Sequence, residues 1–145
     1  MSENPLRTGV IGVGSMGRNH ARIYRELADS ELIGVADADT AAAAAAATEF
    51  DTSIRETDDL LDAADAVSVA VPTRAHAPVV RDCIDAGVDV LVEKPFVADP
   101  AVGRELGKAA AEAGVTIQVG HVERFNPAVR TLLSAFRDLS VVADR

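Results

Sequence analysis

One stretch near the N-terminus most constrains the fold of this chain, because an apolar run, a glycine-rich turn and a helical pattern follow one another without a gap. The apolar run Leu6–Ile11 predicts a buried strand. Ser15–Leu27 predicts a helix, with Met16, Ile23 and Leu27 spaced so that they lie on one face. A strand that passes straight into a helix through a tight turn favours an α/β fold.

Three glycines, Gly12, Gly14 and Gly17, occupy the turn with the spacing G-x-G-x-x-G. In a dinucleotide-binding loop the first glycine permits a tight turn, the second lets the backbone approach a pyrophosphate, and the third allows close packing of helix against strand. The amides of Ser15 and Met16 would then face an anion at a helix N-terminus. A purely structural turn with positive φ angles also needs glycines, so the motif alone leaves both interpretations open.

An acidic residue stands where a dinucleotide-binding loop needs one. The second apolar run, Glu31–Ala36, ends at Asp37, 20 residues after Gly17. A carboxylate at that place binds ribose hydroxyls and repels a 2′-phosphate, and the next three residues include no arginine to receive one. The sequence therefore favours NAD over NADP as cofactor, against the alternative that Asp37 is only a solvated turn residue.

Helical and strand patterns alternate along the chain, which predicts a doubly wound parallel sheet of about six strands with right-handed crossovers. Ala41–Ala47, seven consecutive alanines, belongs to a helix because alanine has the highest helix propensity. Thr57 is a candidate N-cap. The remaining expected elements are strands at Thr52–Ile54, Ala66–Val71, Val88–Val92 and Val115–Val119, and helices at Thr40–Glu49, Asp58–Ala63, Thr73–Ala86 and Pro100–Ala113.

The last segment departs from this alternation. Pro127–Leu139 predicts a further helix, and Ser140–Ala143 predicts the first residues of another strand. We therefore expect a dinucleotide-binding domain over residues 1–126, with residues 127–145 leading into a second domain for substrate binding and oligomerisation that lies beyond this sequence.

Charge and composition exclude several classes of protein. The 145 residues are 48% apolar, which suits one globular domain, and the net charge of −9 disfavours nucleic acid or an anionic membrane as a partner. Cys83 is the only cysteine, so we expect neither an internal disulfide nor a zinc site. No stretch has the pattern of a secretion signal or a membrane span, so we expect a cytoplasmic protein that holds no metal.

Further candidate site residues stand at the expected strand ends, where open parallel sheets bind their ligands. They are Pro72, Thr73 and His76 after one strand, Glu93, Lys94 and Pro95 after the next, and His121, Arg124 and Asn126 after the last. His76 could contact the nicotinamide ribose or bond local backbone. Arg124 and Asn126 could each contact cofactor or substrate, or stabilise the loop before Pro127. A cis bond before Pro95 would aim Lys94 into the crevice. His20, inside the first helix, is expected to be a packing or surface residue.

Over nearly its whole length the chain resembles the glucose-fructose oxidoreductase, inositol dehydrogenase and rhizopine-catabolism family. The matching features are the glycine loop, Asp37, Val71–His76 and, most specific of all, Glu93-Lys94-Pro95. The resemblance implies a Rossmann fold and hydride transfer between a sugar or polyol carbon and a nicotinamide. It further implies that Lys94 bonds the substrate hydroxyl and assists its proton transfer, while an aspartate and a histidine of a second domain complete the acid–base set.

Gly120–Pro127 is similar to family members that oxidise UDP-linked N-acetylated amino sugars at the 3-hydroxyl. The resemblance implies a small-molecule substrate and a homo-oligomeric full-length protein, either a dimer or a tetramer, and the 145 residues alone are expected to be inactive. Two other interpretations stay open. A non-catalytic NAD or redox sensor would share the fold but has no evident need for Lys94, and an S-adenosylmethionine methyltransferase would leave Glu93-Lys94-Pro95 unexplained.

Overall fold

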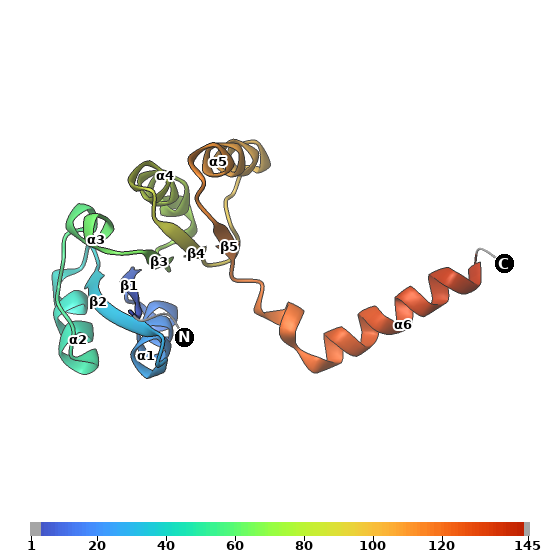
Figure 1. Ribbon diagram of the computed structural model, residues 1–145, viewed down its shortest axis with the longest axis horizontal. Coiled ribbons are helices and arrows are strands. Elements are labelled where there is room, and N and C mark those ends of the chain that lie inside the picture. Colours follow the sequence, from blue (N-terminus) through green and yellow to red (C-terminus); the bar gives the residue numbers. More distant parts are fainter. Residues whose placement is uncertain (1–3, 144–145) are drawn as a thin grey trace.

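A parallel sheet with helices on both faces forms the body of the domain (Figure 1). The computed structural model describes residues 4–143. Five strands lie in the order β2-β1-β3-β4-β5, and every neighbouring pair is parallel. The strands are β1 (Leu6–Ile11), β2 (Ser30–Ala36), β3 (Ala66–Val69), β4 (Asp89–Val92) and β5 (Ile117–Val119). The helices are α1 (Ser15–Glu26), α2 (Thr40–Phe50), α3 (Thr57–Ala63), α4 (His76–Ala86), α5 (Pro100–Ala113) and α6 (Pro127–Ala143), with short 3₁₀ turns η1 (Thr73–Ala75) and η2 (Val122–Phe125).

The helices divide between the two faces of the sheet, so the core has two halves. Helices α1 and α2 cover one face, and α3, α4 and α5 cover the other (Figure 1). Val10 and Val35 pack with Phe50 of α2 on the first side, while Val67 and Val69 pack with Leu106 of α5 on the second. Because successive side chains of a strand point to opposite faces, strands covered on both sides are apolar throughout, as their sequences indicate.

The alanine run forms a packed helix, as its composition predicts. In α2 the side chain of Asp39 caps the N-terminus by accepting bonds from the amides of Ala41 and Ala42. Ala43 and Ala46 are buried against the sheet, and a methyl group is small enough to allow that close approach. Helix α2 therefore holds the end of β2, where Asp37 follows, close to the glycine turn.

Strand β1 lies inside the sheet, with β2 at the sheet edge on one side and β3 on the other. The chain leaves β1 toward β2 and later returns to place β3 on the opposite edge of β1, so the strand order reverses there. Open α/β sheets bind ligands at the carboxyl ends of the strands beside such a reversal. The fold therefore directs attention to the ends of β1, β2 and β3.

Three sequence-based expectations about the elements are wrong. Thr52–Ile54 forms no strand of the sheet: Ile54 makes one isolated bridge to Val35, so five strands replace the expected six. Glu56 rather than Thr57 is the N-cap of α3, without a side-chain bond. Ser140–Ala143 continues α6 instead of starting a strand.

The predicted face of α1 is also solvent-exposed rather than buried. Met16, Ile23 and Leu27 are each about half exposed, and the residues that α1 buries are Gly17 and Ala21. Small residues lie at the helix–sheet contact because α1 approaches the sheet closely.

Helix α6 extends away from the sheet and its covering helices (Figure 1). Leu132, Leu133 and Phe136 on this helix are more than half exposed. Over the described residues 4–143, none of the helices is long and apolar enough to cross a membrane.

Candidate functional site

The glycine turn after β1 has the geometry that a nucleotide-binding loop requires. Gly12 has φ +89°, which only glycine adopts readily, and a Cβ there would lie 2.7 Å from the backbone of Ala70. A Cβ on Gly17 would lie 1.8 Å from the carbonyl oxygen of Gly12, so the first turn of α1 packs directly on the loop. Gly14 instead borders open space, because a Cβ there would have nothing within 4 Å of it. The first and third glycines are thus needed by the fold, while the second leaves room for an approaching group.

Asp37 ties the end of β2 to this loop. One carboxylate oxygen, Oδ2, accepts a bond from the Val13 amide at 2.7 Å, and the other, Oδ1, accepts one from the Asp39 amide at 2.8 Å. The side chain is only partly buried, so lone pairs of both oxygens remain accessible for hydroxyl groups. The carboxylate is therefore positioned by the backbone before any ligand arrives.

A cleft of about 910 Å³ runs over these residues, within the range of about 300–1,000 Å³ common for ligand pockets. Its lining includes Gly12, Gly14, Ser15, Met16 and Asp37 from the first two strand ends, with Val71, Pro72 and Arg74 from the segment after β3. The cleft thus lies at the carboxyl ends of β1, β2 and β3, where the strand order reverses. Arg74, which stands far from Asp37 in the sequence, lines the same cleft and was not predicted as a site residue.

A second cavity of about 250 Å³ continues the cleft toward β4. The two cavities share Met16, Ala70, Val71 and Pro72, and the second adds Thr73, His76, Glu93 and Lys94 to the lining. Lys94 is exposed, and no hydrogen bond or ion pair joins its ammonium to another side chain among residues 4–143. The structure therefore brings together the glycine loop, Asp37 and the Lys94 segment in one continuous depression.

His76 bonds local backbone, which was one of its two predicted roles. The ring is 1% exposed; its Nδ1 lies 3.0 Å from the carbonyl oxygens of both Pro95 and Phe96, and its Nε2 lies 2.9 Å from that of Val71. The Lys94-Pro95 bond is cis, as anticipated from the sequence. His76 thereby joins the segment after β3 to the loop that carries Lys94.

His20 packs against the sheet, one of its two expected roles, but the sequence did not indicate the bonds that it makes there. Its ring bridges β3 and the residue after β4: Nδ1 is 2.9 Å from the Ser68 hydroxyl, and Nε2 is 2.8 Å from Oε1 of Glu93. Tyr24, one turn further along α1, bonds the same Ser68 hydroxyl at 2.7 Å. The sequence signal was available in the spacing, because residues 17, 20 and 24 lie on one face of a helix.

Arg124 lies apart from both cavities, on the exposed turn η2. Its neighbour Asn126 supports the loop, since the Asn126 side chain accepts a bond from the Ala128 amide and donates one to Glu123. Of the two predicted roles for these residues, the geometry of Asn126 agrees with loop stabilisation. Within the part of the chain that the structure describes, Arg124 makes no side-chain contact with the cleft.

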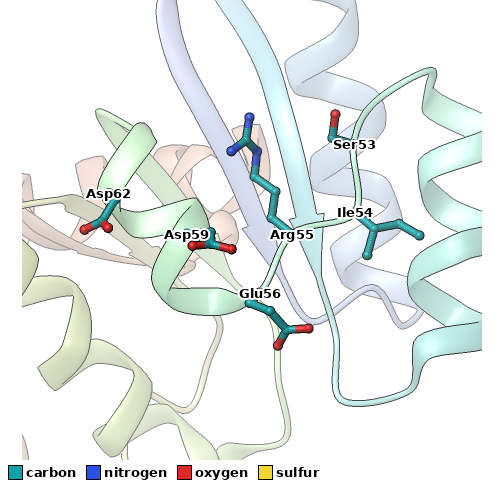
Figure 2. Close-up of a pocket in the computed structure, with 6 residues that line it drawn as sticks. All are labelled: Ser53, Ile54, Arg55, Glu56, Asp59 and Asp62. Atoms are coloured by element: carbon teal, nitrogen blue, oxygen red, sulfur yellow. The ribbon is translucent and has the colours of Figure 1, made fainter.

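A further cavity, of about 540 Å³, lies beside the sheet edge, between the segment after α2 and helix α3 (Figure 2). Arg55 runs along β2 and donates from Nε to the carbonyl oxygen of Ile33, while Glu56, Asp59 and Asp62 line the rest (Figure 2). Three carboxylates repel a pyrophosphate, so this cavity does not suit a dinucleotide. The cleft over the glycine loop is the one that fits.

These features together define a Rossmann domain with a dinucleotide-binding cleft: a tight turn, an open approach at Gly14, and a carboxylate held at the end of the second strand. Comparison with known proteins identifies which kind. The model of the family described as "Oxidoreductase family, NAD-binding Rossmann fold" matches residues 6–121. The chain belongs to this oxidoreductase family, which is the glucose-fructose oxidoreductase and inositol dehydrogenase family that the sequence resembles, and the match decides against the methyltransferase interpretation.

Two curated relatives of similar sequence are dehydrogenases. The chain is 40% identical to UDP-N-acetylglucosamine 3-dehydrogenase of Acidithiobacillus ferrooxidans, over 90% of this chain and 41% of that protein. It is 38% identical to inositol 2-dehydrogenase 4 of Saccharopolyspora erythraea, over 88% of this chain and 39% of that protein. A solved structure of the Acidithiobacillus enzyme superposes with a TM-score of 0.85 at 39% identity, covering 90% of this chain and 43% of that one. The chain therefore spans about two fifths of the length of these relatives.

Proposed function

We propose that this chain is the cofactor-binding part of a dehydrogenase that moves a hydride between a nicotinamide ring and a hydroxyl-bearing carbon of a sugar, polyol or sugar nucleotide. The observation that carries the proposal is the position of Lys94, in a cavity continuous with the nucleotide cleft and without a side-chain partner among the described residues. The relatives named for UDP-N-acetylglucosamine and inositol supply the substrate class.

The residues present fit the cofactor. The open space at Gly14 lets the loop amides reach a pyrophosphate, and the fixed carboxylate of Asp37 accepts bonds from ribose hydroxyls. We assign NAD rather than NADP, because the Asp37 carboxylate repels a 2′-phosphate. Arg74 in the same cleft is the one lining residue that would favour such a phosphate, so it is the residue to vary when the preference is measured.

Lys94 would act on the substrate oxygen. When bound, the nicotinamide ring accepts or gives the hydride. The Lys94 ammonium donates a hydrogen bond to the substrate oxygen, and this bond strengthens as negative charge develops on that oxygen in the transition state. The protein's part is to hold this donor at a fixed place beside the cleft, for which His76 clamps the backbone on the C-terminal side of Lys94.

Substitution of Lys94 tests the proposal in the full-length protein, with NADH absorbance as readout and UDP-N-acetylglucosamine and myo-inositol as probe substrates. We expect Lys94→Ala to lower kcat by about 100-fold or more while the NADH dissociation constant stays near that of the unmodified protein. Lys108→Ala is the matched control, since Lys108 is the only other lysine of the sequence, and among the described residues its exposed ammonium pairs with Glu112 of the same helix alone.

Two results would contradict the assignment. Near-normal turnover of Lys94→Ala removes Lys94 from the chemistry. NADH binding without turnover of either probe by the unmodified full-length protein would favour the alternative of a non-catalytic redox sensor. A homo-oligomeric assembly and a cytoplasmic location belong to the same proposal, and size-exclusion chromatography with light scattering tests the first.

A further inference from the structure

A chain of polar side chains lies between α1 and the sheet and ends at Glu93, the residue before Lys94. It consists of Tyr24 and His20 on α1, Ser68 in the middle of β3, and Glu93 at the end of β4. Ser68 is fully buried, and its neighbours on the strand point into the opposite half of the core, so Ser68 faces α1. The side chains of His20 and Glu93 are 14% and 12% exposed. These four groups satisfy one another in a region that is otherwise apolar.

The direction of the bond between His20 and Glu93 follows from the carboxylate. A carboxylate only accepts, so the bond to Oε1 of Glu93 needs the proton on Nε2 of His20. On the other side of the ring, Nδ1 lies 2.9 Å from the Ser68 hydroxyl, and Tyr24 lies 2.7 Å from the same hydroxyl. His20 thus presents an N–H donor to the Glu93 carboxylate, and its ring is held from both sides.

Glu93 is enclosed on three sides. Its Oε1 accepts the bond from His20, its Oε2 lies 3.3 Å from the Lys94 amide, and a Cβ on Gly120 would come within 3.3 Å of both oxygens. Gly120 therefore leaves just the room that the carboxylate occupies. One carboxylate oxygen is thus engaged by α1 and the other by the backbone of Lys94, and no ion pair joins this carboxylate to the Lys94 ammonium among the described residues.

We infer that His20 is a positioning residue which anchors the Glu93 carboxylate to the cofactor-binding helix, and so keeps the Lys94 ammonium free for the substrate. Without His20 the carboxylate would lose its only side-chain partner among the described residues. A poorly solvated carboxylate without a donor is costly. The Lys94 ammonium lines the same cavity as Glu93 and has no side-chain partner among the described residues, so it is available as a donor. Glu93 would then turn toward Lys94 and occupy the place of the substrate oxygen. The same bond makes α1, which begins at the glycine loop, part of the support of the catalytic segment.

The inference rests on the proposed role of Lys94, but its first test needs no activity. The chain has two lysines, so a sample labelled with ¹⁵N- and ε-¹³C-lysine gives one backbone and one side-chain signal for each. We expect His20→Leu to move both Lys94 signals and to leave both Lys108 signals in place. His20→Gln, which keeps an amide donor within reach of Glu93, should restore the Lys94 signals toward their original positions.

Kinetics of the full-length protein provide the second test, again with UDP-N-acetylglucosamine and myo-inositol as probes. We expect His20→Leu to lower kcat by about 100-fold, as for a displaced catalytic group, with the NADH dissociation constant little changed. Glu93→Gln removes the charge that competes for Lys94. The effects of His20→Leu and Glu93→Gln on kcat should therefore not add in the double variant, because both act through one carboxylate.

The outcomes separate the two proposals. If Lys94→Ala keeps its turnover, the catalytic assignment fails, while the lysine signals still decide whether His20 positions Glu93. If Lys94 is required but His20→Leu shifts neither the Lys94 signals nor kcat, the positioning role alone is wrong. Should His20→Leu fail to fold, His20→Asn takes its place, because the shorter amide can still bond Ser68 in the position of Nδ1 but does not extend to Glu93. Unmoved Lys94 signals in that variant would overturn the inference.

Discussion

Substitution of alanine for two glycines of the loop, Gly17 and Gly14, separates the glycine that the fold requires from the glycine that ligand binding requires. A Cβ on Gly17 would have to move by about 1.6 Å from the Gly12 carbonyl oxygen to reach the 3.4 Å at which ordinary contact begins. The obstacle is backbone, so no flexible side chain can yield. We expect Gly17→Ala to destabilise the fold by about 1–3 kcal/mol, the usual penalty of overpacking. In a chain of this size that lowers Tm by about 3–10 °C.

Gly14→Ala should behave in the opposite way. Gly14 has φ −65° and ψ −166°, extended backbone that alanine adopts without strain, and nothing lies within 4 Å of the added methyl. We therefore expect an unchanged Tm. The methyl would nevertheless stand where the loop approaches a pyrophosphate, so NADH affinity should fall by about tenfold or more, about 1.4 kcal/mol of binding free energy.

Thermal unfolding followed by fluorescence measures the first quantity, and titration of NADH fluorescence measures the second. Gly107→Ala is the control: Gly107 lies exposed inside α5 with open space around it, so alanine should stabilise the helix by about 1 kcal/mol and leave NADH binding alone. Unchanged NADH affinity in Gly14→Ala would refute the assignment of the open side of the loop to the pyrophosphate.

Three further substitutions or conditions test other parts of the structure. Asp37→Asn should weaken NAD binding and narrow the preference for NAD over NADP, and more strongly so while Arg74 is retained. Isothermal calorimetry with both cofactors measures the two affinities. If neither affinity differs between the variant and the unmodified protein, Asp37 does not bind the ribose. Burial raises the pKa of the Cys83 thiol to about 12, so the folded chain should resist iodoacetamide at pH 8 and react only when unfolded, as mass spectrometry would reveal. As the pH rises, the thiol ionises in the unfolded chain before it ionises in the folded one. The free energy of unfolding should therefore fall as the pH rises from the ordinary pKa of a thiol to the higher pKa of Cys83 in the fold. The hydrogen bonds from Arg7 hold the pKa of Asp65 below its usual range. The pair therefore stabilises the fold at a pH above the pKa of Asp65 in the unfolded chain, and this stabilisation is lost as the pH falls through the pKa of Asp65 in the fold. The pair is exposed, so Asp65→Asn should flatten the acid limb of a denaturation curve only slightly, and a large change would contradict this.

Features set by neighbours in the chain were the ones that the sequence predicted well. The glycine turn, the alanine helix and the acidic residue after β2 depend on local geometry and propensity, and the structure has all three. The Glu93-Lys94-Pro95 segment was found because it follows an apolar run directly. The carboxyl ends of all strands in a parallel sheet lie at the same edge. The residues that follow different strands could therefore be placed near one another without coordinates.

What escaped prediction depends on register between distant segments. His20 and Glu93 stand 73 residues apart, and only the pairing of β1, β3 and β4 brings them together with Ser68. The apolar pattern of α1 also gave the wrong face of the helix. The contact with the sheet is made by Gly17 and Ala21, while the larger apolar side chains are about half exposed. At the C-terminus a short β-branched run favours a strand, but α6 continues through it since no sheet lies nearby to pair with.

The placement of Gly17 and His20 on one helix has a consequence for how such a chain can change in length. Each residue of an α-helix turns the next by about 100° and advances it by about 1.5 Å. One residue inserted between these two would leave the loop contact intact and swing the imidazole away from Glu93. The segment between Gly17 and His20 therefore has a fixed length, set at one end by the contact of Gly17 with the Gly12 carbonyl oxygen and at the other by the bond of His20 to Glu93.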